Sequence, residues 1–89
     1  MIFDWDPEKE KINRKKHKVA FFEACQVFAD RYMLSLYDEG HSDDEDRWIT
    51  MGQSLGGIIL VVVHTYEKIR QKESVRIISA RKATKHEEK

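Results

Sequence analysis

The chain of 89 residues contains one cysteine, one proline and no aliphatic run longer than the six residues at 58–63. A lone cysteine cannot form an internal disulfide, so the fold does not depend on an oxidising compartment. Cys25 lies within an apolar helical pattern and is expected to be a small core residue. Six apolar residues are far too few to cross a bilayer, and the first residues lack a signal-peptide pattern. We therefore expect a cytoplasmic protein with no membrane partner.

An excess of charge of one sign is missing as well, because sixteen basic and sixteen acidic residues cancel. The net charge therefore indicates no partner, but the charges are unevenly distributed. Residues 8–18 carry six basic and two acidic side chains, whereas residues 38–46 carry six acidic side chains and no lysine or arginine. Such segregation can create a basic patch on a neutral protein. The alternative interpretation is plain solvated surface, and the two carry about equal weight.

The motifs of several enzyme classes are also missing. No serine lies on a glycine-flanked elbow, and no glycine-rich loop is present to cradle a phosphate. Acidic residues cluster around His41, but their spacing matches neither a zinc motif nor a calcium-binding loop. We therefore expect no metal and no cofactor. Proton transfer and the stabilisation of phosphate charge are the chemistry that remains.

The hydrophobic spacing predicts one α+β domain over residues 1–89, with two N-terminal helices packed on an antiparallel sheet in the order β-α-α-β-β-β-β. Strands are predicted at residues 1–5, 32–37, 47–55, 58–66 and 75–81, and helices at residues 7–17 and about 19–30. Residues 58–66 are apolar on both faces, which predicts a central strand covered on both sides. Residues 67–74 are expected to be a polar connection and residues 82–89 a charged tail.

The last predicted strand carries charge where apolar residues belong, because it reads Val-Arg-Ile-Ile-Ser-Ala-Arg. An unpaired buried guanidinium is strongly disfavoured, so Arg76 and Arg81 need an open sheet face or an anionic partner. The planar fork of arginine suits phosphate, which makes nucleic acid the first candidate. In a regular strand the two arginines point to opposite faces unless a bulge intervenes. We expect Arg81 at or just past the strand end, where it can turn to either face.

Cleavage of RNA needs only the chemistry that this sequence retains. The ribose 2′-OH can attack its own phosphate, so the protein must hold the backbone, neutralise charge and move protons. We predict Arg47, Arg76 and Arg81 as the charge-stabilising residues, and His17 or Lys16 as the proton-transfer residue, since histidine titrates near neutral pH. The predicted RNA-binding residues are Lys9, Asn13, Lys15 and Lys82.

Other interpretations of the same residues stay open. Arg47 has Glu45 as a neighbour two positions away and is also expected to pair with it. His17 lies near the end of the first predicted helix, where a cation is favoured. The alternative functions are a non-catalytic RNA-binding module and an interaction subunit whose basic ends bind an acidic protein.

The ordered set of motifs resembles the BrnT family of type II toxins, from Phe-Asp-Trp-Asp near the start to Arg-Ile-Ile-Ser-Ala-Arg-Lys-Ala near the end. The matching residues are 3–6, 9, 13, 16–19, 22–24, 27–30, 41–42, 45–47, 51–52, 57, 60–62 and 76–83. The resemblance implies a RelE-like fold and a ribonuclease that inhibits translation. It also implies a BrnA-like ribbon-helix-helix antitoxin, with which the toxin forms a heterotetramer on operator DNA. The same motifs contain Lys16, His17, Arg47, Arg76 and Arg81, whereas Lys18 stands where the family pattern has glycine.

Overall fold

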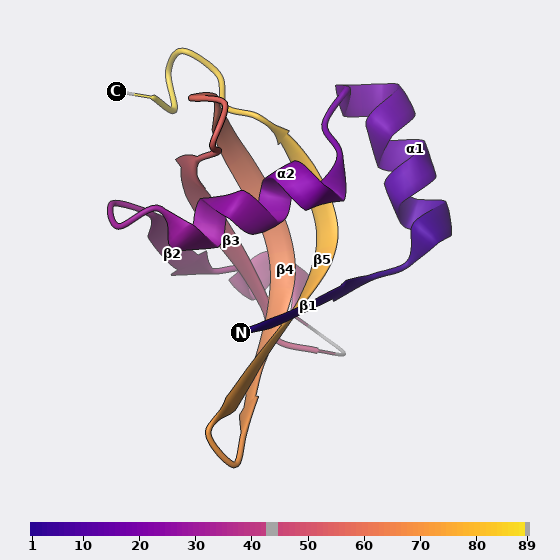
Figure 1. The fold of residues 1–89 in the computed structure, drawn as a ribbon, viewed down its shortest axis with the longest axis vertical. Helices are drawn as coiled ribbons and strands as arrows, with labels where there is room; N and C mark the ends of the chain where they lie inside the picture. Colours follow the sequence, from indigo (N-terminus) through magenta and orange to yellow (C-terminus); the bar gives the residue numbers. More distant parts are fainter. Residues whose placement is uncertain (43–44, 89) are drawn as a thin grey trace.

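The computed structural model describes residues 1–42 and 45–88 and confirms the predicted order of elements (Figure 1). The elements are β1 (Ile2–Trp5), α1 (Pro7–His17), α2 (Phe21–Gln26), the 3₁₀ helix η1 (Val27–Ala29), β2 (Leu34–Tyr37), the 3₁₀ helix η2 (Glu39–His41), β3 (Arg47–Gln53), β4 (Ile59–Ile69) and β5 (Lys72–Lys82). The predicted second helix therefore consists of α2 and η1. Asp43 and Asp44 of the acidic segment lie outside the described residues. Within residues 1–42 and 45–88, no helix is long and apolar enough to span a membrane.

The five strands form one sheet in the order β1-β5-β4-β3-β2, with β4 in the centre as predicted. Neighbouring strands are antiparallel except for β1, which pairs in parallel with β5 from Ile2 opposite Ser74 to Trp5 opposite Ile77. The expectation of a purely antiparallel sheet is therefore wrong for β1. Side chains alternate between faces in both kinds of pairing, so the sequence pattern carried no information about the direction of this strand.

The predicted polar connection at residues 67–74 is instead the end of a long hairpin. β4 continues to Ile69 and β5 begins at Lys72. Arg70 and Gln71 form the turn with φ values of 49° and 73°. Positive φ at both positions is the pattern of a type I′ hairpin turn, and asparagine and glycine usually supply it. Neither residue is present here, and the hairpin projects beyond the helices with both faces exposed (Figure 1), so apolar alternation is missing.

The ends of α1 follow from local sequence. The side chain of Asp6 caps the helix by accepting the Glu8 N–H at 2.9 Å, and Pro7 occupies the first turn. The last turn is basic, and Lys18 ends the helix with φ 61°, while its N–H donates to the Arg14 carbonyl at 2.9 Å. The predicted break after His17 is therefore confirmed, with lysine in a conformation that glycine adopts more readily.

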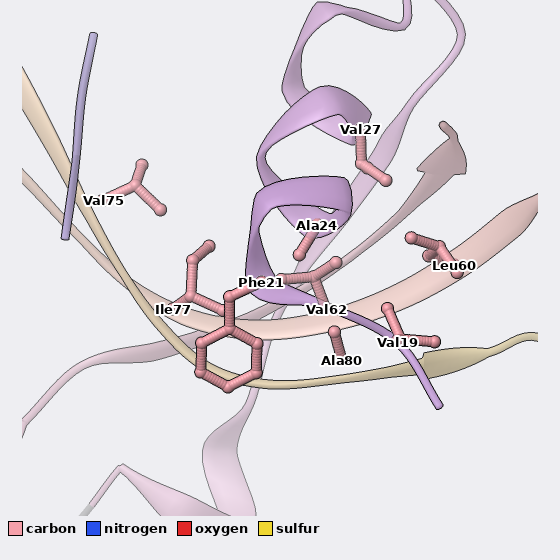
Figure 2. Packing of buried hydrophobic residues seen from close by; sticks show 9 residues of the cluster. All are labelled: Val19, Phe21, Ala24, Val27, Leu60, Val62, Val75, Ile77 and Ala80. Carbon is pink, nitrogen blue, oxygen red and sulfur yellow. The ribbon is translucent and has the colours of Figure 1, made fainter. Parts of the chain in front are cut away.

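The core lies between α2 and one face of the sheet, where side chains from the helix segment meet those of β4 and β5 (Figure 2). The buried apolar residues are Val19, Phe21, Ala24, Val27, Leu60, Val62, Val75, Ile77 and Ala80. Cys25 packs at the margin of this cluster, and burial raises its pKa to about 11. α1 lies beside β5 rather than over the sheet (Figure 1). The two helices thus leave the second face open. The prediction that β4 is covered on both sides holds only in part, because Val61 on that face is 6% exposed, whereas Val63 and Thr65 are half-buried.

Candidate active site

A bulge in β5 decides which residues reach the open face of the sheet. Val63 of β4 pairs with Ser79, but the next residue, His64, pairs with Ile77. Ile78 is therefore an extra residue in β5. An extra residue shifts the alternation of all side chains that follow it in the strand.

The bulge places both arginines of β5 on the open face. Before it, Val75 is buried in the core and Arg76 points away from it; after it, Ala80 is buried and Arg81 points away. Ser79 lies between the two arginines on the same face. Arg81 is the next-to-last residue of β5. The bulge, and not the strand end, therefore resolves the conflict in parity that the sequence presented.

Arg47 joins this face through the strand register. Thr65 of β4 pairs with Arg47 on one side and with Arg76 on the other, so all three residues share a face. Adjacent strands lie ~4.8 Å apart, which puts the Arg47 and Arg76 backbones ~10 Å apart. Arg81 pairs with Val61, four residues along β4 from Thr65, a separation of ~13 Å along the strand. The three arginine side chains thus leave the sheet on the same face, from backbone positions ~10–13 Å apart.

Each of these arginines contacts a carboxylate of the same chain. The pairs are Arg76 Nη1 with Asp4 Oδ2 at 2.7 Å, Arg47 Nε with Glu45 Oε1 at 3.6 Å, and Arg81 Nη1 with Glu87 Oε1 at 2.8 Å. The expected Arg47–Glu45 pair is confirmed. A separation of 3.6 Å is too long for a hydrogen bond, so the buried Nε of Arg47 has no hydrogen-bond partner among the described residues.

A notch between α1 and β5 adjoins the open face. It has a volume of about 330 Å³ and is lined by Lys9, Ile12, Asn13, Lys16, His17, Ile78 and Ser79. Lys9, Asn13, Lys16 and His17 therefore lie on one face of α1, the face that lines the notch. Ser79 belongs both to the notch and to the arginine-bearing face, so Lys16 and His17 lie at the margin of the same surface.

Asn13 has a structural task in this arrangement. Its Nδ2 donates to the carbonyls of Ala80 at 2.8 Å and Val19 at 3.4 Å, and its Oδ1 accepts the Ala80 N–H at 3.2 Å. β1 pairs with β5 only as far as Ile77, so Asn13 supplies the partner that the next part of this strand edge would lack. Both amide hydrogens are used, and we infer that Asn13 positions β5 and Arg81.

Two further predicted RNA-binding residues lie outside this surface. Lys15 is exposed on α1 and does not line the notch. Lys82 pairs with Leu60, which is buried in the core, so its side chain leaves β5 on the face opposite Arg81. Trp5 also lies on the helix side of the sheet, where it contacts Phe21 edge-on at 6.1 Å.

The sequence reasoning missed Ser79, Thr65 and Glu87. Ser79 and Thr65 lie on the open face because of the strand register and the bulge. No local sequence motif predicts either the register or the bulge. The position of Glu87 could have been predicted, because residues 84–87 match the Ser/Thr-x-x-Glu pattern of a helix start. Within residues 1–42 and 45–88, no group of three or more His, Cys, Asp or Glu side chains is placed to hold a metal ion.

The geometry defines an α+β protein with helices on one face of a mostly antiparallel five-stranded sheet and clustered arginines on the other. A family model described as the ribonuclease toxin BrnT of a type II toxin–antitoxin system matches residues 5–87. The chain belongs to this family of ribonuclease toxins, and the family implies a protein antitoxin as partner.

A solved structure supports the fold. The chain is similar to the ribonuclease toxin BrnT of Brucella abortus, whose crystal structure was determined at 1.1 Å resolution. The TM-score is 0.64 at 20% sequence identity, over 96% of this chain and 100% of that chain. The similarity concerns the fold. A comparison with curated proteins finds no match.

Proposed function

We propose that the open face cleaves RNA without a metal ion, by internal attack of the ribose on its own phosphate. The 2′-oxygen forms a bond to phosphorus and the bond from phosphorus to the 5′-oxygen breaks. The products are a 2′,3′-cyclic phosphate and a free 5′-hydroxyl. One proton leaves the 2′-OH and another reaches the departing 5′-oxygen, so the protein has to move protons and stabilise negative charge.

The arginines have the charge-stabilising task. Arg47 and Arg81 approach the open face from β3 and β5 and would bind the scissile phosphate. Arg47 supports this assignment because its contact with Glu45, at 3.6 Å, is too long for a hydrogen bond and leaves the guanidinium without a fixed carboxylate partner among the described residues. Arg76 is held by Asp4 at 2.7 Å, and we assign it to orienting the substrate.

We assign proton transfer to Lys16 and His17, at the margin of the notch. Lys16 and His17 lie at the C-terminal end of α1, and His17 is half-buried beside Ser79. Either side chain can accept a proton from the 2′-OH or donate one to the leaving oxygen. Lys9 lines the same notch and would hold a neighbouring phosphate. Lys15 and Lys82 would add sequence-independent attraction at greater distance.

The β5 bulge carries this proposal. Without the extra residue, Arg81 would point to the core side of the sheet, and the open face would hold Lys82 in its place, beside Arg47 and Arg76. The bulge brings the third guanidinium onto the same face and brings Ser79 beside the notch with Lys16 and His17. Bulges often aim side chains next to active sites.

The test is cleavage of an end-labelled RNA by the purified protein in the presence of EDTA. We expect products that end in a 2′,3′-cyclic phosphate, and no cleavage of the same RNA with 2′-O-methyl groups. Arg81→Ala should lower the rate by about a hundredfold or more, the usual cost of removing a charge-stabilising donor. Arg31→Ala is the matched control, because Arg31 is an exposed arginine in the turn between η1 and β2.

Other outcomes assign the site differently. Cleavage that EDTA abolishes would overturn the metal-free mechanism. Salt-sensitive binding of RNA without cleavage, weakened by Arg81→Ala, would indicate the non-catalytic RNA-binding module. Equal activity of the Arg81→Ala and Arg31→Ala proteins would remove Arg81 from the site.

For the partner we propose an antitoxin with a ribbon-helix-helix region that binds operator DNA, assembled with the toxin as a heterotetramer in the cytoplasm. The type II family supports a protein partner, and three arginines on one face favour an acidic segment over that face. Coexpression with the product of the adjacent reading frame, followed by measurement of the mass of the complex, tests this. A complex without affinity for operator DNA would contradict the assignment.

A further inference from the structure

The charged C-terminal segment forms an ordered turn. Glu87 Oε1 accepts the Thr84 N–H at 2.8 Å, and the Glu87 N–H donates to Thr84 Oγ1 at 3.2 Å. The Glu88 N–H donates to the Thr84 carbonyl at 3.1 Å, as in a helical turn. This reciprocal pattern is a capping box. It fixes the carboxylate of Glu87 in one position.

That position lies on the guanidinium of Arg81. Nη1 donates to Oε1 and Nη2 donates to Oε2, both at 2.8 Å. The Arg81 guanidinium, helped by the Thr84 N–H, lowers the pKa of Glu87 to about 2, and the carboxylate in turn raises the pKa of Arg81. Both groups are therefore charged at any physiological pH. Two parallel N–H donors facing two oxygens is also the arrangement in which arginine binds phosphate.

The turn is joined to the sheet by few contacts. The Ala83 N–H donates to the Ile59 carbonyl at 2.9 Å, and beyond Ala83 the hydrogen bonds of the described residues are internal to the turn or run to Arg81. By contrast, Asp4, the partner of Arg76, belongs to β1 and is fixed by strand pairing. The Glu87 carboxylate can thus leave its arginine without disturbing the sheet.

We propose that residues 84–88 are an autoinhibitory latch, in which Glu87 occupies the place of a substrate phosphate on Arg81. This inference rests on the proposed function, since it needs Arg81 to be a phosphate-binding residue. RNA must displace Glu87 to bind. The apparent affinity for RNA is then reduced by the fraction of molecules in which Arg81 is free.

The experiment compares Glu87→Gln with Glu88→Gln, using binding of a 2′-O-methylated RNA that cannot be cleaved. Both variants remove one negative charge from the same turn, so general electrostatic attraction changes equally. Glu88 is exposed and makes no side-chain hydrogen bond or ion pair with the described part of the chain. We expect Glu87→Gln to bind about threefold to fivefold more tightly than Glu88→Gln, the scale of a partly exposed ion pair. Glu87→Ala should show the same gain, and unfolding midpoints verify that all variants fold.

The outcomes separate the latch from the proposed function. If Glu87→Gln binds no more tightly than Glu88→Gln while Arg81→Ala still weakens binding, the latch is wrong and the phosphate site stands. If Glu87→Gln binds more weakly than Glu88→Gln, Glu87 positions Arg81 instead, and the latch is again wrong. If none of the proteins binds RNA, the proposed function fails and the latch fails with it.

Discussion

A buried histidine forms the centre of the polar network on the helix side of the sheet. His64 is 3% exposed, and its Nδ1–H donates to the Thr65 carbonyl at 2.9 Å. A carbonyl only accepts, so Nδ1 carries the hydrogen and Nε2 accepts from the Thr50 hydroxyl at 2.6 Å. The Thr50 hydroxyl in turn accepts from Ser35 at 2.6 Å. Only the bond from the Thr50 hydroxyl to Nε2 requires a neutral imidazole, because a protonated ring also donates from Nδ1 to Thr65.

Stability should therefore depend on the protonation of His64. Burial lowers the pKa of His64 from its ordinary 6.5, although the Thr65 hydrogen bond opposes the shift. The unfolded chain then binds a proton at a higher pH than the folded chain, so the stabilisation is complete above about pH 6.5 and is lost as the pH falls below it. Between pH 7.5 and 5.5 the Tm of the wild type should fall a few degrees further than that of His64→Gln.

The control for this comparison is His86→Gln, which removes an exposed histidine from the C-terminal turn. The Tm of His86→Gln should fall between pH 7.5 and 5.5 by as much as the wild-type Tm does. Parallel curves for the wild type and His64→Gln would show that His64 does not control the acid side of the stability profile.

At the scale of elements, the end of α1 is held in an unfavourable backbone conformation. Lys18 adopts φ 61°, where its Cβ crowds the backbone. Lys18→Gly should stabilise the protein by about 0.5–1 kcal/mol, because the relief of this crowding exceeds the entropy that glycine adds to the unfolded chain. Urea unfolding measures the change. Lys18→Ala keeps the Cβ and should give no gain; equal stabilisation by both variants would assign the effect to the lysine charge instead.

The elements differ in how far the sequence determined them. α1 was predictable to the residue because Asp6, Pro7 and the basic last turn are local signals. The extension of β4 and β5 to Ile69 and Lys72 was not, since its side chains are exposed on both faces and the turn lacks glycine. The direction of β1 is set by its pairing with a strand about 70 residues away, and alternation is the same in either direction.

At the scale of the whole molecule, the candidate site was only partly predictable. The sequence indicated the residue types of the site, because arginines inside an apolar strand need an open sheet face or an anionic partner. The arginines share a face because of the bulge at Ile78. Asn13 has a structural task because β1 ends at Trp5, which pairs with Ile77. Ala80 is therefore left without a strand partner on that side. Both are properties of the assembled sheet. Local sequence patterns determine what a strand contains, whereas the register of its neighbours determines where each side chain points.

A protein without net charge attracts RNA only where its charges are unbalanced, so the salt dependence of binding should come from the open face and from the basic residues near it. Each phosphate neutralised on a single strand contributes about 0.7 to the slope of log affinity against log salt. Arg47→Ala and Arg81→Ala should each make the slope shallower by about 0.7, measured with the uncleavable RNA at several salt concentrations. Arg76→Ala should change it less, because Asp4 already neutralises Arg76. Arg31→Ala should leave the slope unchanged; a change equal to that of Arg47→Ala and Arg81→Ala would mean that RNA responds to diffuse charge and that these two arginines form no distinct phosphate site.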